Sequence, residues 1–284
     1  MTPGIHTEPH DTTGVASEQV HWDPGLTYTS YLALEPLLTL QRPRTQAHDE
    51  HLFIIIHQAS ELWMKLAIVE LGAAMRELNE GRVRPALKML SRISRIQAQL
   101  TQSWNVLATM TPSDYSAFRN GLGQSSGFQS WQYRQIEFQL GNKNPSLIRA
   151  HHNNPPARSL LERVLGQPSI YDLVLRILSG AGLTIPPDLV DRDYAVPYVP
   201  HELVEQAWLK IYSEPDRHWD LYELAEKLVD IEHQFQVWRF SHMKTVERII
   251  GFKRGTGGTA GVSYLVRALE LRFFPELWSV RTSL

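Results

Sequence analysis

Apolar residues recur at steps of three and four along most of this chain, which is the spacing of one face of an α-helix. The stripe is clearest between Asp230 and Gly251, where it runs through Ile231, Phe235, Trp238, His242, Val246 and Ile249. His242 lies in the middle of this stripe. Burying an unpaired polar group costs roughly 1–3 kcal/mol, so an imidazole at this position either hydrogen-bonds inside the core or serves as a ligand.

A second helix is predicted from His48 to Leu78, and His57 lies on its apolar stripe. The surrounding segment from Leu52 to Ile56 is apolar on every side, as in a fully buried helix. A core histidine with satisfied hydrogen bonds is the simpler explanation of either residue alone. Two such histidines on separate helices are harder to explain as an accident than one.

The remaining pattern predicts helices over residues 85–110, 128–140, 158–180, 201–212 and from Trp219 into the stretch that carries His242. Thr111 and the proline after it mark the start of a short helix that ends near Gly121 or Gly123. Residues 144–157, the proline-rich residues 184–200 and the glycine-rich residues 251–265 are expected to be loops. No alternating run suggests a sheet, so the fold class is all-α and bundle-like.

The polar, aperiodic residues 1–25 are expected to form a flexible N-terminal arm, followed by one all-α domain over 26–284. Tyr28, Tyr31 and Leu32 share a face if their segment is helical. Such a face packs either on the chain's own core or on another surface.

The amino-acid composition excludes several classes of function. With 28 basic and 30 acidic residues the net charge is −2, and no basic block indicates a nucleic-acid or anionic-membrane partner. No signal peptide and no membrane-spanning run are recognised, so a cytoplasmic location is expected. The absence of cysteine excludes disulfides, thiolate metal sites and covalently attached haem. The single Glu-x-x-His pair, Glu18 and His21, lies in the polar arm, which argues against a di-iron bundle.

Two further features carry candidate chemistry. Tyr115 and Arg119 are four residues apart and so share a helix face. An isolated pair of this kind usually lies on the surface and has no functional role. The glycine-rich segment lacks the strand and the Lys-Ser/Thr of a phosphate loop. Its glycines allow close backbone approach to a ligand, and Thr256 supplies a hydroxyl.

Four motifs in order resemble the tryptophan 2,3-dioxygenase family: FIIIHQASELWMKL around His57, DYSAFRNGLGQSSGFQSWQYRQIEF from Asp114, WRFSHMKTVERIIG around His242, and GTGGTAGVSYL from Gly255. The resemblance extends from about Tyr28 to the C-terminus. The chain departs mildly from the family pattern at Thr29, Ser30 and Thr259.

The resemblance implies an all-α homotetramer with one haem b per subunit, which inserts both atoms of O2 across the indole C2–C3 bond of L-tryptophan to give N-formyl-L-kynurenine. His242 matches the haem ligand, and Ser126 and Gly127 match residues that line the oxygen side of the haem. His57 matches the residue that hydrogen-bonds the indole N–H. The other matched positions bind or enclose the substrate: Phe53 beside the ring, Arg119 with Tyr115 on the carboxylate, Thr256 on the ammonium, and Tyr28, Tyr31 and Leu32 in a neighbouring subunit's pocket.

Composition alone leaves open a haem-based sensor or a purely structural helical protein. Arg119 and Thr256 discriminate between these alternatives, because a sensor or a scaffold has no need to clamp an amino acid.

Overall fold

The computed structural model describes residues 25–258 and 260–284. All regular elements in this part of the chain are helices, which confirms the all-α prediction. The proposed arm over residues 1–25 lies outside the described residues except for Gly25, and Thr259 lies outside them as well. The chain divides into two compact units between Arg42 and Pro43.

The described part of the first unit contains two short helices, α1 (Tyr28–Leu32) and α2 (Leu34–Leu38). Thr27 begins α1 with a capping box, in which its hydroxyl accepts from the Ser30 backbone N–H and the Ser30 hydroxyl accepts from the Thr27 N–H. Ala33 separates the two helices in a left-handed conformation with φ 49°. The segment that begins at Tyr28 is therefore helical, which is the condition under which Tyr28, Tyr31 and Leu32 were expected to share a face.

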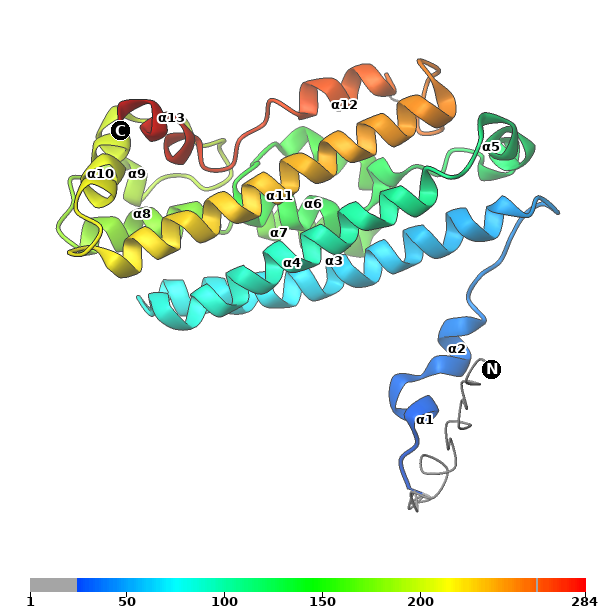
Figure 1. The fold of residues 1–284 in the computed structure, drawn as a ribbon, viewed down its shortest axis with the longest axis horizontal. Helices are drawn as coiled ribbons and strands as arrows, with labels where there is room; N and C mark the ends of the chain where they lie inside the picture. Colours follow the sequence, from blue (N-terminus) through cyan, green and yellow to red (C-terminus); the bar gives the residue numbers. More distant parts are fainter. Residues whose placement is uncertain (1–24, 259) are drawn as a thin grey trace, which may run out of the picture. The chain divides into compact units, whose positions relative to one another are not determined.

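Three long helices form the frame of the second unit: α3 (Asp49–Asn79), α4 (Val83–Leu107) and α11 (Trp219–Ile250). They lie side by side (Figure 1), and their apolar stripes meet in one core. Leu71, Leu90 and Leu228, one from each helix, are at most 1% exposed. Gly81 turns the chain from α3 into α4 with φ +74°, a conformation that a side chain would strain.

Shorter helices cover this frame: α5 (Pro112–Arg119), α6 (Trp131–Leu140), α7 (Pro155–Leu165), α8 (Ile170–Gly180), α9 (Pro187–Val190), α10 (Glu202–Ser213), α12 (Val262–Ala268) and α13 (Pro275–Ser283). Three 3-10 turns join them: η1 (Asn120–Leu122), η2 (Gly127–Gln129) and η3 (Pro145–His151).

The expectation of a loop over 144–157 is wrong, because η3 and the start of α7 lie there. Each begins with a proline at its first turn, where the missing N–H costs nothing. The expected loops over 184–200 and 251–265 likewise contain α9 and the start of α12.

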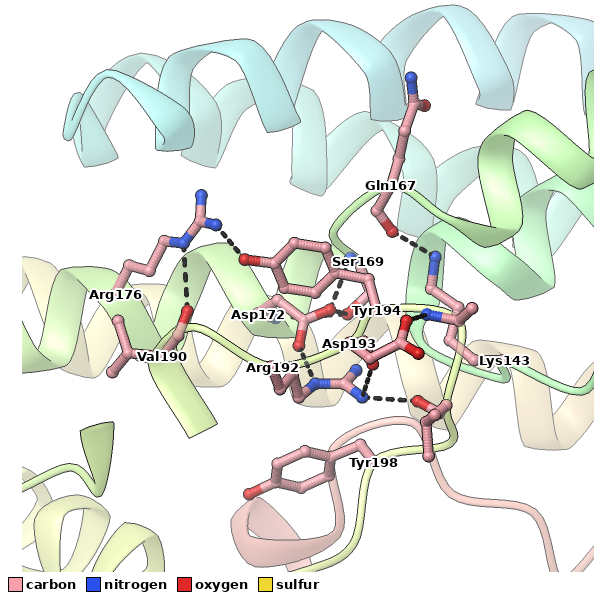
Figure 2. Close-up of polar contacts among 12 residues, drawn as sticks. Lys143, Gln167, Ser169, Asp172, Arg176, Val190, Arg192, Asp193, Tyr194 and Tyr198 are labelled. Atoms are coloured by element: carbon pink, nitrogen blue, oxygen red, sulfur yellow. Dashed lines mark hydrogen bonds and ion pairs between the residues drawn. The ribbon is translucent and has the colours of Figure 1, made fainter. Parts of the chain in front are cut away.

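The proline-rich segment is held in place by one buried ion pair and by hydrogen bonds (Figure 2). Arg192 Nε donates to Asp172 Oδ1 at 2.7 Å, and Asp172 also caps α8 through Ser169. Beside it Lys143, 1% exposed, donates to three carbonyl groups at the end of α7, the last of them on Gln167 at 2.6 Å. A cation at a helix C-terminus satisfies orphaned carbonyls and complements the helix dipole.

Glu232 ties the C-terminal segment to α11. Its fully buried carboxylate accepts from the backbone N–H groups of Phe273 and Phe274 and from Trp278 Nε1, at 2.7, 3.0 and 2.9 Å. The helix that carries His242 is thereby fixed against the polypeptide that follows α12.

The outer face of α3 is apolar and exposed. A window of this helix has a mean hydropathy of 1.4. Among the described residues α3 is therefore long and apolar enough to cross a membrane by length and composition alone, although no membrane-spanning run was predicted. Its inner face packs in the core through Met64, Ala67 and Leu71. Its outer face carries Ile55 and Leu62, which are 49% and 50% exposed, so the prediction of a fully buried helix around Leu52 to Ile56 is wrong within this chain.

Candidate active site

A cavity of about 270 Å³ opens between the C-terminal halves of α4 and α11, the N-terminal half of α3 and the segments around η2 and Thr256. Its wall is mainly aromatic and aliphatic. The structure brings together most of the residues that the sequence singled out, and the cavity is lined by Phe53, His57, Tyr115, Ser126, Gly127, His242 and Thr256.

His242 lies against two indole rings in this wall. Its ring stacks on Trp104 with 4.6 Å between centroids and an interplanar angle of 18°, and Trp238 is 5.5 Å away. Burial lowers the pKa of His242 to about 4, and the nearby His57 adds to the effect. The imidazole is therefore neutral at neutral pH and keeps a nitrogen lone pair for a ligand bond.

His57 has a defined tautomer. Its Nδ1 lies 2.7 Å from the Phe53 carbonyl oxygen, and a carbonyl can only accept, so Nδ1 carries the hydrogen. Burial lowers the pKa of His57, although the Phe53 carbonyl and Glu61 act in the opposite direction. The neutral ring therefore presents Nε2 as a hydrogen-bond acceptor. The Phe53 ring lies 4.1 Å away, centroid to centroid.

Two indole N–H groups beside His242 have no partner within the described protein. Trp104 Nε1 and Trp238 Nε1 are both buried and make no hydrogen bond, and both residues line the cavity. Buried donors without acceptors are uncommon and costly. Their position indicates that an occupant with polar atoms completes the site.

Arg119 and Thr256 connect the glycine-rich loop to the rest of the site. Arg119 Nη2 donates to the Arg254 carbonyl at 2.7 Å, and Thr256 Oγ1 donates to the Ser125 carbonyl at 2.5 Å. Thr256 lines the cavity, whereas Arg119 does not. Arg119 instead reaches the glycine-rich loop at the Arg254 carbonyl. Burial raises the pKa of Tyr115, and the positive charge of Arg119 opposes that rise.

Comparison with known proteins assigns a family to this arrangement. Residues 12–284 match the family model described as tryptophan 2,3-dioxygenase. The chain belongs to the tryptophan 2,3-dioxygenase family. It is 54% identical over 266 residues to the tryptophan 2,3-dioxygenase of Burkholderia pseudomallei strain 1106a, covering 94% of this chain and 87% of the relative. The enzyme of the same name from Burkholderia mallei strain SAVP1 is 53% identical over the same shares. The alternatives of a sensor or a structural protein are therefore set aside.

The predicted arm residues of this family member lie on α1 in the first unit. Tyr28 and Tyr31 are 75% and 73% exposed, and Leu32 is 41% exposed. They have no buried apolar environment within their own unit, so their expected role in a neighbouring subunit's pocket stays a prediction.

Sequence reasoning missed several cavity residues. Trp104 lies in the helix predicted over residues 85–110 and was not singled out, although its ring contacts both His57 and His242. Arg134 and Glu137 of α6 and Arg239 of α11 form a buried ionic cluster in the same wall. No local spacing connects residues 137 and 239, so only the fold could bring them together.

A second hollow of about 430 Å³ lies between α10 and α13, lined by polar residues that include Glu202, Glu205 and Glu276. Glu276 is engaged by the Tyr171 hydroxyl, which donates to it at 2.9 Å, and by the His201 backbone N–H. No group of three or more potential metal ligands occurs among the described residues. This hollow therefore carries none of the predicted chemistry.

Proposed function

We propose that this chain is a haem-dependent dioxygenase that converts L-tryptophan and O2 into N-formyl-L-kynurenine, the first step of tryptophan degradation. The observation that carries the proposal is the pair of neutral histidines around one apolar cavity. One of them offers a ligand lone pair and the other a fixed hydrogen-bond acceptor. The family membership supplies the reaction class.

The residues present fit a haem b, one per subunit, with His242 as the iron ligand. A neutral imidazole in an apolar wall suits a flat hydrophobic macrocycle, and the unpartnered N–H groups of Trp104 and Trp238 suit an occupant that carries acceptors. Ser126 and Gly127 would line its oxygen side. When bound, the haem supplies the iron chemistry that activates O2.

His57 would orient the indole ring. Its Nε2 accepts a hydrogen bond from the indole N–H, because Nδ1 is committed to the Phe53 carbonyl. The indole N–H is a very weak acid, so this bond positions the ring and does not need to remove its proton. Phe53 forms the wall beside the ring and helps to exclude water.

The amino-acid end of the substrate would be held by Arg119, Tyr115 and Thr256. Arg119 uses one N–H on the Arg254 carbonyl, and its remaining four donors include the pair that a carboxylate accepts. The Thr256 hydroxyl donates its hydrogen to the Ser125 carbonyl, so its oxygen is free to accept from an ammonium group. The contacts within the protein and the proposed contacts with substrate are therefore compatible.

We also propose a cytoplasmic homotetramer in which the segment with Tyr28, Tyr31 and Leu32 completes a neighbouring subunit's pocket. The exposed apolar face of α3 supports association with further copies, because such a continuous stripe is unusual on a soluble monomer. Light scattering of the wild type and of Leu62→Glu tests this proposal. A tetramer is expected for the wild type and smaller species for the variant, whereas a monomeric wild type would contradict it.

The reaction is tested with isotopically labelled oxygen. Haem-loaded protein is incubated with L-tryptophan under ¹⁸O2, and the product is analysed by mass spectrometry. Incorporation of two heavy oxygen atoms into N-formyl-L-kynurenine is expected. Incorporation of a single atom, or no product from protein with a full haem content, would refute the proposed reaction.

A further inference from the structure

The loop from Arg254 to Gly258 crosses the segment at Ser125 and Ser126 unusually closely. A Cβ atom built on Gly257 would lie 2.6 Å from the Ser126 Cβ and 2.9 Å from its Oγ. Real Cβ atoms essentially never approach other atoms within 3.0 Å. The backbone φ of Gly257 is outside the left-handed region, so alanine fits its conformation and is excluded only by Ser126.

The Ser126 side of this contact is held firmly. Ser126 is the N-cap of η2, where its Oγ accepts from the Phe128 N–H at 3.3 Å and its own N–H donates to Gln129 Oε1 at 3.2 Å. The Gln129 N–H also donates to the Ser126 carbonyl at 2.9 Å. A side chain at position 257 would therefore displace the loop and leave Ser126 in place.

The loop side of the contact leads directly to the cavity. Gly255 and Thr256 line the cavity, and the Gly258 N–H closes a turn on the Gly255 carbonyl at 3.0 Å. The same turn is attached to α5 through Arg119 and the Arg254 carbonyl. Because Thr256 precedes Gly257, a displacement at Gly257 also moves the Thr256 hydroxyl.

We propose that Gly257 is a positioning residue whose missing side chain lets the loop rest on Ser126 and so places the Thr256 hydroxyl at the cavity wall. This inference rests on the proposed function for the statement that Thr256 meets the substrate ammonium. Gly257 itself needs no contact with substrate. Its role is to allow the short distance between the loop and the start of η2.

A pair of substitutions tests the contact directly. In the haem-loaded full chain, Gly257→Ala is expected to raise the Kd for L-tryptophan at least tenfold, with a much smaller change for indole-3-propionate, which lacks the ammonium. Adding Ser126→Gly removes the obstructing atoms, and glycine is tolerated at an N-cap. The double variant is therefore expected to bind L-tryptophan more tightly than Gly257→Ala alone.

Gly180→Ala is the matched control, because its added Cβ meets nothing within 4 Å and its φ is not positive. It is expected to leave the Kd unchanged. Equal Kd values for Gly257→Ala and the wild type would overturn the inference. A double variant no better than Gly257→Ala would overturn it as well.

Trypsin cleavage after Lys253 and Arg254 provides a readout that is independent of the reaction. Gly257→Ala is expected to accelerate this cleavage, and the double variant to slow it again. Unchanged cleavage rates would refute the contact even if the enzyme degrades tryptophan. Inactivity of the wild type together with the expected cleavage pattern would refute the proposed function and leave the contact standing.

Discussion

Replacing Arg119 with alanine should separate two contributions of one guanidinium. The first is the proposed bond to the substrate carboxylate, and a hydrogen bond to a charged group contributes about 1.5–3 kcal/mol. The second is the bond from Nη2 to the Arg254 carbonyl at 2.7 Å, which is exposed to solvent; because water weakens the interaction of the charge there, about 0.5–1.5 kcal/mol is expected. Since about 1.4 kcal/mol corresponds to a tenfold change in affinity, loss of the carboxylate bond alone weakens L-tryptophan at least tenfold.

Tryptamine distinguishes the two contributions because it keeps the indole and the ammonium but lacks the carboxylate. Arg119→Ala should weaken its binding only through the lost attachment of the loop, roughly two- to tenfold by the same conversion. The assay is calorimetric titration of both ligands into haem-loaded wild type and variant. The haem content and CO binding should be unchanged, since the cavity wall does not include Arg119.

Arg158→Ala is the matched control for loss of an arginine. Arg158 forms an exposed ion pair with Glu162 on α7, and such pairs contribute little. It should leave both affinities unchanged. If Arg119→Ala weakened tryptamine as much as L-tryptophan, Arg119 would only hold the loop, and its role on the carboxylate would be withdrawn.

The remaining predictions concern His57 and Glu137. His57→Ala should lower turnover but leave residual activity, because an orienting hydrogen bond contributes only about 0.5–1.5 kcal/mol; complete loss of chemistry with unchanged L-tryptophan affinity would show that proton removal is required. Burial lowers the folded-state pKa of His57. When the pH falls below the ordinary pKa of histidine, the unfolded apoprotein therefore binds more protons at this residue than the folded apoprotein does. The stability that His57 contributes is then present above the ordinary pKa of histidine and is lost as the pH falls toward the lower folded-state pKa. In urea denaturation, the free energy of unfolding of His57→Gln should therefore fall less steeply with decreasing pH than that of the wild type. Glu137→Gln leaves Arg134 and Arg239 without their buried carboxylate and should lower the free energy of unfolding by about 3–5 kcal/mol. As the control, Glu162→Gln removes the carboxylate of an exposed ion pair and should lower it by less than about 1 kcal/mol. Equal losses of stability in the two variants would contradict the importance of the buried cluster.

The long helices were predictable because their periodicity extends over many turns. The start of α5 was also predictable, since Thr111 and Asp114 form a complete capping box. The short elements were not: η3 and α7 begin at prolines, which in sequence resemble a loop as much as a first helical turn. An apolar stripe also does not reveal which face of a long helix meets the core, so the exposed face of α3 emerged only from the packing.

The two histidines were found because a polar residue on an apolar stripe requires an explanation. The cluster of Arg134, Glu137 and Arg239 had no such signal, because its partners come from α6 and α11, which are distant in sequence. The contact between Gly257 and Ser126 depends on how two loops cross, and residue spacing does not encode that crossing. Arg119 was expected to face the substrate, whereas the structure shows that it also holds the Arg254 carbonyl.

The most direct test of the account is an absorption titration of the apoprotein with haem, followed by addition of L-tryptophan. We expect one haem per chain, with a spectrum typical of histidine ligation that changes when L-tryptophan binds. His242→Ala should bind haem weakly and without that spectrum, because Trp104 and Trp238, its ring neighbours, cannot ligate iron. A wild type that takes up no haem, or a His242→Ala variant with the wild-type haem content and spectrum, would contradict the assignment of this cavity.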